Sequence, residues 1–393
     1  MTADDGTIRS ADDDAGGIGN GAAGRLRVAV DARTLQDRPP GGVGRTLAGV
    51  LAPLARKADL DLLIDGRRPA PEVPEGVRVH ALEAPSRRAS VWLQVAVPRF
   101  LHRYPGVFHC PFYGLPLRQP VPMVVSIYDL TFIDHPEWFP PGRRAALVGQ
   151  ARFAARTAKV VITGSATVAD AIGERLGVGA DRVLVVRPTV AATFLAAGDG
   201  ARAAPAGPAE EPVPDGKAAT GSIQRPYVVA LGGARRRRLP VAVQAWLLAC
   251  RAGADLDLVV VGTERPATGA GGLGWLGAVG DDRLARLLAG ALAFLYPTAY
   301  EGFGLPALEA AACGTPSVCA PVGALPEVLG QAAQWSDGLD PHALARALLG
   351  LVGDPGRRER LARLARAVAL ASNTPESAAG AILGAYRRAW ERA

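Results

Sequence analysis

This chain of 393 residues has little cysteine and almost no lysine: four residues are cysteine, and lysine occurs only at positions 57, 159 and 217 among the 44 basic residues. No cysteine lies in a CxxC motif or pairs with a histidine at metal-ligand spacing, so neither a disulfide framework nor a structural zinc site is indicated. No apolar run approaches the length of about eighteen residues that a membrane span needs, and the first residues lack the pattern of a secretory signal. We therefore expect a cytoplasmic protein with buried thiols.

The composition is that of a folded protein, with 49% hydrophobic and 21% charged residues. The length favours two domains. A net charge of +7 permits binding to phosphates, to nucleic acid or to an anionic membrane surface, but charge alone does not choose among them.

Short apolar runs alternate with helical patterns along most of the chain. Strand-like runs occupy residues 25–31, 59–64, 106–111, 122–130, 159–165, 181–186, 226–233, 257–262, 291–297 and 316–321. Helices are expected at 47–58, 142–158, 240–252 and 281–290, from 306 onward, and at about 375–392. This alternation predicts an α/β protein with two doubly wound, parallel-sheet domains of the Rossmann-like kind. Two such domains joined by a linker imply a cleft, and ligands are expected there because they bind beyond the carboxyl ends of the strands.

The domain boundaries follow from shifts in composition. Residues 1–24 are rich in Asp, Gly and Ala and are expected to be a disordered tail, while residues 196–225 are rich in Pro, Ala and Gly and predict a linker. The N-terminal domain is then 25–195 and the C-terminal domain 226–372. Residues 373–393 form a last helical segment, which we consider a candidate for crossing back to the N-terminal domain.

The segment 291–321 has the strongest functional signal. Its strand is followed by a glycine-containing loop and by Pro306, a residue suited to the first position of a helix. Gly302 and Gly304 let the backbone approach a ligand closely, and the free N–H groups around Phe303 to Leu305 lie at the positive end of the helix dipole. The pattern predicts a phosphate site.

Two carboxylates flank this loop, Glu301 before it and Glu309 in the helix that follows. A carboxylate would repel a phosphate but accepts hydrogen bonds from hydroxyl groups, so a sugar on one side and a ribose on the other are expected partners. The alternative is an ordinary helix start with a solvent-exposed Glu301.

The stretch EGFGLPALEAAACGTPSVCAPVGALPEVLG, residues 301–330, closely resembles the signature of retaining glycosyltransferases of the GT-B fold, the large family-4 group that includes many bacterial mannosyl- and glucosyltransferases. SIYDLTFIDHPEWFP, from residue 126, and VAVDARTLQDRPPGGVGRTL, from residue 28, resemble segments of the same family's N-terminal domain. The likeness spans roughly residues 26–390 apart from the linker.

The resemblance implies roles for particular residues. Glu301 would contact the hydroxyls of the donor sugar, Glu309 the nucleotide ribose, and the loop Gly302 to Leu305 the distal phosphate. Arg236 and Arg237 would neutralise the diphosphate leaving group, a task that suits the bidentate guanidinium. For the run Arg235 to Arg238 the alternatives are a solvated basic turn and a nucleic-acid patch, although no aromatic residues are interleaved with it.

In the N-terminal domain, Gly42 and Gly44 would face the cleft and permit close approach of donor or acceptor, a tight turn being the alternative. Tyr128 and Asp129 take the place of the family's His-Asp pair, so the role of that imidazole against the donor sugar is lost or passes to the phenol. His109 is either a cleft residue or a satisfied structural one.

Two further departures concern the backbone. Between Gly262 and Gly277 the chain is shorter than in the family, so a helix beside the nucleotide base is expected to be absent. Pro188 also lacks the glycine that normally follows it at the hinge.

The resemblance implies transfer of a hexose with retention from a nucleoside diphosphate sugar to a hydroxyl acceptor: a saccharide, a lipid-linked saccharide or a small natural product. Its link to mannosyl transfer favours a GDP-sugar, with UDP- and TDP-sugars open. Cations at the diphosphate imply no metal and no separate cofactor. The alternative is a degenerate member that binds a nucleotide sugar or a partner enzyme without turnover.

Two features bear on metal and membrane binding. The pairs Asp59/Asp61 and Asp255/Asp257 are interpreted as exposed strand-edge residues rather than metal ligands. Basic residues recur along the helix 142–158 and could touch an anionic membrane at the inner face, with a plain solvated face as the alternative. No nucleic-acid partner is expected.

Overall fold

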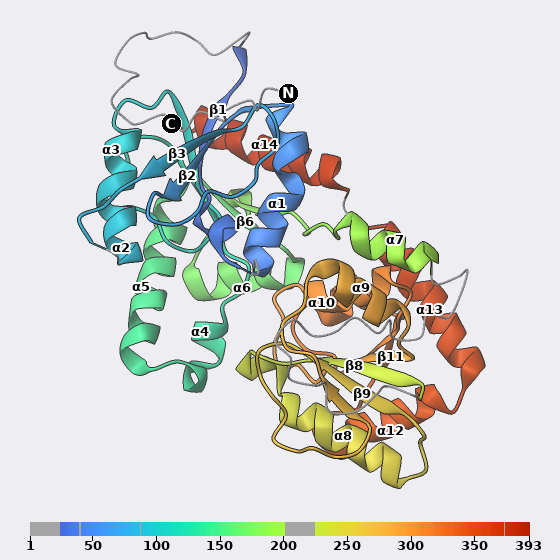
Figure 1. The fold of residues 1–393 in the computed structure, drawn as a ribbon. Helices are drawn as coiled ribbons and strands as arrows, with labels where there is room; N and C mark the ends of the chain where they lie inside the picture. The colour runs from blue at the N-terminus through green and yellow to red at the C-terminus, as the bar shows by residue number, and fades with distance from the viewer. Residues whose placement is uncertain (1–23, 39–40, 87, 201–224, 373) are drawn as a thin grey trace. The chain divides into compact units, whose positions relative to one another are not determined.

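The computed structural model describes residues 24–38, 41–86, 88–200, 225–372 and 374–393, and its chain divides into two compact units (Figure 1). The first unit runs to Thr189 and takes in the C-terminal segment that ends at Ala393, and the second is Val190–Ser372. The expected tail at 1–24 falls almost wholly outside the described residues, as does most of the expected linker.

The first unit is built on a parallel sheet with the strand order β3-β2-β1-β4-β5-β6-β7. Its strands are β1 (Arg27–Asp31), β2 (Asp59–Asp65), β3 (Arg78–Leu82), β4 (Gly106–Cys110), β5 (Met123–Ser126), β6 (Val160–Thr163) and β7 (Val183–Val185). Alternate residues of β1 enter different apolar clusters, Val28 and Val30 one and Ala29 the other, because successive side chains point to opposite faces of a sheet. Both faces are therefore buried.

Helices cover this sheet on both sides. They are α1 (Gly42–Ala55), α2 (Ala89–Val91), α3 (Val97–Leu101), α4 (Thr131–Asp134), α5 (Pro141–Thr157), α6 (Ala166–Leu176) and α14 (Pro375–Glu391). The last of these, α14, begins where the side chain of Thr374 accepts a hydrogen bond from the Ser377 N–H, and it lies beside α1 (Figure 1). It also contacts β4, β5 and β6, so the C-terminal segment is part of the first unit.

The second unit repeats the design with the parallel order β10-β9-β8-β11-β12-β13. Its strands are β8 (Tyr227–Leu231), β9 (Asp257–Val261), β10 (Leu273–Trp275), β11 (Ala293–Leu295), β12 (Ser317–Cys319) and β13 (Ala333–Trp335). Its helices are α7 (Ala192–Gly200), α8 (Leu239–Arg251), α9 (Asp281–Ala289), α10 (Leu305–Ala312), α11 (Leu325–Leu329), α12 (Pro341–Val352) and α13 (Pro355–Leu370).

The expected start of the linker at residue 196 is wrong, because α7 continues to Gly200. This helix belongs to the second unit: Phe194 is fully buried there, and Arg366 of α13 donates to Asp199 at 2.6 Å. The N-terminal domain accordingly ends at Thr189 rather than at residue 195.

Two other expectations differ from the structure. Helix α1 begins at Gly42, so Gly42 and Gly44 lie in the first turn of a helix and not in the expected glycine-rich loop. Strands β3, β10 and β13 were not expected, and each lies at or beside a sheet edge as a short run.

Candidate functional site

The centre of the second sheet is the point where its winding reverses. From β8 the chain passes through α8 to β9 on one side, and from β11 it passes through α10 to β12 on the other. Loops that leave two adjacent strands in opposite directions open a crevice at the carboxyl edge of the sheet, which is where ligands of such folds bind.

These two loops are joined by backbone and side chain. The Ala299 N–H, after β11, donates to the carbonyl oxygen of Arg236, after β8, at 2.8 Å. The side chain of Arg236 then donates through Nε to Oε1 of Glu301 at 3.4 Å. Arg236 keeps 35% of its side chain exposed while Glu301 keeps 6%, so the pair is buried on the carboxylate side and open on the guanidinium side.

Glu301 is held by its own loop as well. The Tyr296 hydroxyl donates a short hydrogen bond to Oε1, and the Thr298 hydroxyl lies 3.5 Å from the same oxygen. Burial raises the pKa of Tyr296 well above its usual range, and the nearby charge of Glu301 raises it further. The phenol therefore stays protonated as a donor. The alternative of a solvent-exposed Glu301 is wrong, since only 5% of the residue is accessible.

A third loop, after β12, packs onto the backbone of Glu301. The Ala324 N–H donates to the Glu301 carbonyl at 2.9 Å, and Gly323 has the positive φ of 54°. A Cβ at Gly323 would stand 2.2 Å from that carbonyl oxygen. Only glycine fits here, because the contact is with backbone that cannot swing away.

Helix α10 starts directly after this loop. Its first residue is Leu305, so the expected start at Pro306 is off by one and Pro306 is the second residue. Gly304 precedes the helix with φ 94°, and its Cβ position lies 2.5 Å from Leu325 Cδ2. Phe303 is 7% exposed and packs into the apolar core. In the first turn Pro306 has no N–H, and the N–H groups of Ala307 and Leu308 donate to the Gly304 carbonyl at 3.0 and 3.1 Å. What this helix end offers an anion is therefore the positive end of its dipole.

Glu309 lies in the second turn of α10 and is 3% exposed. Cys313 follows one turn later, and burial together with the charge of Glu309 raises the pKa of that thiol to about 12. Cys313 therefore stays a neutral thiol at physiological pH. A buried carboxylate at this position is costly unless it receives hydrogen bonds.

The four consecutive arginines after β8 have different surroundings. Arg236 pairs with Glu301, whereas NH1 of Arg237 donates to the Gly232 carbonyl at 2.9 Å, and the charge of Arg237 acts on Tyr296. Arg238 adopts φ 49° and its NH1 donates to the carbonyl of Leu339 at 3.1 Å. Arg235 is exposed. Of the two arginines that the sequence singled out, Arg236 contacts the carboxylate of Glu301 and Arg237 acts on its donor Tyr296.

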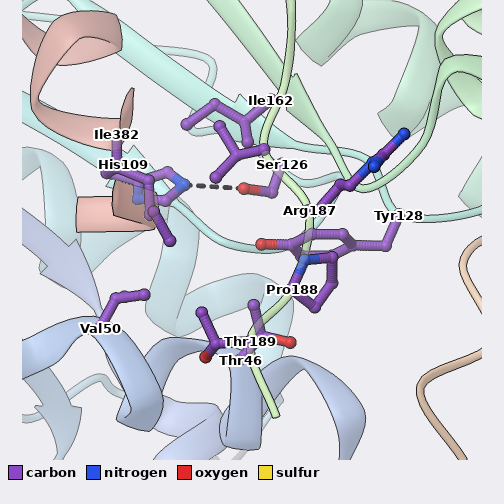
Figure 2. A pocket seen from close by; sticks show the side chains of 12 residues that line it. Thr46, Val50, His109, Ser126, Tyr128, Ile162, Arg187, Pro188, Thr189 and Ile382 are labelled. Carbon is purple, nitrogen blue, oxygen red and sulfur yellow. Dashed lines mark hydrogen bonds between the residues drawn. The ribbon is translucent and has the colours of Figure 1, made fainter. Parts of the chain in front are cut away.

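In the first unit, Tyr128 lines a cavity of about 10 Å³ at the carboxyl ends of β4, β5 and β6. Figure 2 shows its phenol oxygen directed into this cavity, on the side of Ser126 and His109. Thr46, from the second turn of α1, lines the same cavity, so the start of the helix that holds Gly42 and Gly44 lies close to Tyr128.

Asp129, the next residue, begins the turn into α4. Its Oδ1 accepts from the Thr131 N–H at 3.1 Å and from the Thr131 hydroxyl at 2.7 Å. In the described part of the chain both of these bonds use the same oxygen, Oδ1.

Comparison with known proteins gives the family. Residues 225–354 match the family described as "Glycosyl transferases group 1", and residues 41–189 match the one described as "Glycosyl transferase 4-like domain". The chain belongs to the family-4-like glycosyltransferases. The resemblance seen in the motifs is thereby confirmed.

Two relatives of this family match over long stretches. The O-antigen chain mannosyltransferase B of Escherichia coli is 28% identical over 274 residues, 64% of this chain and 67% of the relative. The D-inositol 3-phosphate glycosyltransferase of Acidothermus cellulolyticus is 32% identical over 299 residues, 69% of this chain and 63% of the relative. The matched part therefore spans about two thirds of each relative.

Solved structures confirm the GT-B fold. Sucrose-phosphate synthase from Thermosynechococcus elongatus aligns with a TM-score of 0.71 at 18% identity and covers 94% of this chain and all of its own (100%). The protein Alr3699/HepE from Anabaena, solved in complex with UDP-glucose, aligns with a TM-score of 0.64 at 16% identity and covers 92% of this chain and 98% of its own. At such identities the likeness concerns the fold alone.

The predicted site residues of this glycosyltransferase-family chain fall into two groups. Arg236, Arg237, Glu301 and the segment 302–305, together with Glu309, gather in the second unit, while Gly42, Gly44, Tyr128 and Asp129 lie in the first. Sequence reasoning missed Tyr296 and Thr298, the donors to Glu301. Both residues precede Glu301 by a few positions in the sequence, but no sequence pattern shows that their hydroxyl groups point toward its carboxylate.

Among the residues that the structure describes, no group of three or more His, Cys, Asp or Glu side chains could hold a metal ion. The expectation that the aspartate pairs are exposed is wrong for Asp61 and Asp257, which are 0% and 3% exposed. Arginines neutralise both, Arg78 at 2.7 Å from Asp61 and Arg225 at 2.6 Å from Asp257. Hydrogen bonds from His80 and Arg78 lower the pKa of Asp61 despite its burial, so it remains ionised.

The expected absence of a helix beside β9 agrees with the structure, in which the chain passes from β9 to β10 without one. In the described part of the chain, no helix is both long and apolar enough to cross a bilayer.

Proposed function

We propose that this protein is a retaining, metal-independent glycosyltransferase that moves a hexose from a nucleoside diphosphate sugar to a hydroxyl acceptor. The observation that carries the proposal is the pairing of Arg236 with Glu301 at 3.4 Å, at the reversal point of the second sheet and directly before the N-terminus of α10. A cation, a sugar-binding carboxylate and an anion-favouring helix end are what a nucleotide sugar requires there.

In this proposal the acceptor hydroxyl attacks the anomeric carbon as the bond from that carbon to the diphosphate oxygen breaks. The leaving diphosphate takes the proton of the acceptor hydroxyl on the same face, so configuration is retained. Arg236, Arg237 and the first turn of α10 oppose the charge that builds on the diphosphate. Because these groups supply the positive charge, no metal and no separate cofactor are invoked.

The remaining residues position the donor. Glu301 accepts from hydroxyl groups of the sugar through the oxygen that its protein donors leave open, and Glu309 accepts from the ribose. The segment Gly302 to Leu305 holds the distal phosphate, while Asp129, with Tyr128 and the start of α1 at Gly42 and Gly44, borders the donor or the acceptor.

The relatives support a nucleotide sugar as donor. One is named a mannosyltransferase, and HepE was solved with UDP-glucose. We favour a mannose-like hexose on GDP or UDP, and a saccharide, a lipid-linked saccharide or a small natural product as acceptor.

A thermal-shift screen with GDP, UDP, TDP, ADP and CDP, each with and without EDTA, tests the donor site. A ligand at about a hundred times its Kd adds roughly 2.7 kcal/mol to stability. One nucleotide should stabilise the parent regardless of EDTA and fail on Arg236→Gln and Glu309→Gln, while the exposed-site control Arg235→Gln keeps the response. Stabilisation that needs a metal would contradict metal independence, and no stabilisation by any nucleotide would contradict the donor site.

A second candidate, binding of a nucleotide sugar or a partner enzyme without turnover, is favoured by one observation. The Tyr128 hydroxyl is directed into the cavity of the first unit, on the side of Ser126 and His109, which favours loss of the role that the family's imidazole has against the donor (Figure 2). Hydrolysis or transfer that appears in Tyr128→His, with none in a parent that still binds the nucleotide, would establish this candidate. Turnover in the parent would exclude it.

We also propose that the protein works in the cytoplasm, with peripheral contact at the inner face of the membrane. Arg143, Arg152 and Arg156 are exposed along α5 and can attract anionic lipid. Co-sedimentation with vesicles that contain anionic lipid should fall when these three are changed to glutamine. Binding of RNA with a steep salt dependence would instead contradict our expectation that nucleic acid is no partner.

A further inference from the structure

A chain of hydrogen bonds runs from the C-terminal helix to Ser126, which lies beside the residue that replaces the family's histidine. Nδ1 of His109, on β4, lies 2.8 Å from the Tyr386 hydroxyl of α14, and its Nε2 lies 2.9 Å from Oγ of Ser126 at the end of β5 (Figure 2). Ser126 and Tyr128 line the same cavity, the phenol oxygen is directed toward the side of Ser126, and the interaction with Ser126 lowers the pKa of that phenol against the larger effect of its burial. Tyr386, His109 and Ser126 are therefore hydrogen-bonded in series, and the series ends beside Tyr128.

All of this lies inside the first unit. Tyr386 and Ser126 are fully buried and His109 is 3% exposed. The imidazole and the Tyr386 ring also pack with their centroids 5.5 Å apart. Among the residues that the structure describes, the charged and titratable groups that border the cavity are His109, Tyr128 and Arg187, and no carboxylate lines it to stabilise an imidazolium. His109 is accordingly neutral and has one N–H.

Counting protons links the directions of these bonds, because a neutral imidazole has one N–H and a serine hydroxyl has one proton. We take Ser126 to direct its proton toward Tyr128, the sense that agrees with the lowering of the phenol pKa by Ser126. Ser126 must then accept from His109, so the imidazole proton is on Nε2. Nδ1 has no proton and accepts from the Tyr386 hydroxyl. Tyr386 thus selects the tautomer on which the rest of the series depends.

We propose that Tyr386 and His109 are positioning residues that hold the Tyr128–Asp129 segment of the candidate site through Ser126. The inference rests on the proposed function, since it concerns residues assigned to that site. The phenol of Tyr128 lies in the cavity and holds the loop after β5 in place. The next residue, Asp129, is positioned by the same loop. The C-terminal helix, which the chain reaches only after passing through the whole second unit, thereby acts on this site.

The test compares Tyr386→Phe with the matched control Tyr227→Phe. Both remove one buried phenol hydroxyl with one partner, since Tyr227 donates to the Leu287 carbonyl at 2.9 Å in the second unit. The imidazole tautomer is read by nitrogen NMR on protein labelled at its five histidines, with His109→Gln to assign the His109 signals. Hydrogen exchange of the peptide 123–134 reports the loop, and transfer or hydrolysis of the donor reports the activity.

In the parent we expect the Nε2–H tautomer of His109, without titration between pH 5 and 8. Tyr386→Phe should bring in the Nδ1–H tautomer, speed exchange in 123–134 and lower kcat about fivefold at an unchanged donor KM. Tyr227→Phe should change none of the three. An Nδ1–H tautomer in the parent, or unaltered loop exchange and kcat in Tyr386→Phe, would overturn the proposal. A parent without any turnover would refute the proposed function alone, because tautomer and exchange are measured without substrate.

Discussion

Nε of Arg236 lies 3.4 Å from Oε1 of Glu301, although the two residues are 65 positions apart and follow different strands. The backbone bond from Ala299 to Arg236 fixes the two loops to each other, so the approach does not depend on long side chains alone. The guanidinium of Arg236 is partly exposed and the carboxylate of Glu301 is buried, so the positively charged member of the pair is the one that faces solvent.

Changing Arg236 to alanine should lower kcat by about 10²-fold or more, because a preorganised charge opposite the leaving group is lost. Arg235→Ala is the matched control: it removes an exposed arginine one position away and should change kcat less than about twofold. Steady-state kinetics with a sugar donor built on the nucleotide that the thermal-shift screen identifies measures both. Equal losses in the two variants would mean that the basic turn acts only through its overall charge.

Tyr296→Phe should destabilise the second unit by about 1–3 kcal/mol, since a buried carboxylate loses its short hydrogen bond while the aromatic packing is kept. The measurement is chemical denaturation followed by circular dichroism. Unchanged stability would show that Thr298 and Arg236 satisfy Glu301 without the phenol.

Gly323→Ala should impair both folding and activity, because the new Cβ would stand 2.2 Å from the carbonyl oxygen of Glu301. The control is Gly314→Ala, which has a similar positive φ of 77° but no atom within 4 Å of its Cβ position. Both variants carry a backbone cost of about 1 kcal/mol, and only Gly323→Ala adds about 1–3 kcal/mol of steric strain and a loss of kcat. Identical kinetics for the two would disprove the tight contact with Glu301.

The burial of His109 should make the first unit sensitive to acid. Burial lowers the pKa of His109 to about 3, whereas in the unfolded chain it is about 6.5. Between these two pKa values the unfolded state therefore binds a proton at His109 that the folded state does not bind. The contribution of the neutral ring to the free energy of unfolding is complete above pH 6.5 and is lost as pH falls from 6.5 toward 3. The loss should reach about 2 kcal/mol between pH 6 and pH 4.

His109→Gln has no titrating ring, so its unfolding free energy should fall less steeply over the same pH range. The exposed His342→Gln serves as control and should behave like the parent. Denaturant unfolding at stepwise pH values measures this, and parallel curves for the parent and His109→Gln would refute the neutral buried state.

Individual helices and strands differ in how well the sequence predicts them. Helices α8, α9 and α14 begin and end within a residue of their predicted limits, because apolar periodicity and terminal signals are local properties. Strand β13 has three residues and no bounding signal, so nothing local marks it; it exists because Val318 of β12 offers Gln334 a partner. The start of α1 at Gly42 could not be foreseen, since glycine disfavours helix by itself.

The sequence by itself determined the two α/β domains, the glycosyltransferase family and the loop from Glu301 to Leu305, because these depend on alternation, turn residues and a dense motif. Only the tertiary structure decided that Tyr296 serves Glu301, that Arg236 is the arginine paired with it, and that Tyr386 reaches His109. The contacts of Arg236 and Tyr386 join residues that lie far apart in the sequence, and the contact of Tyr296 depends on how its side chain is oriented within the loop. Such directions arise from packing, which no local pattern encodes.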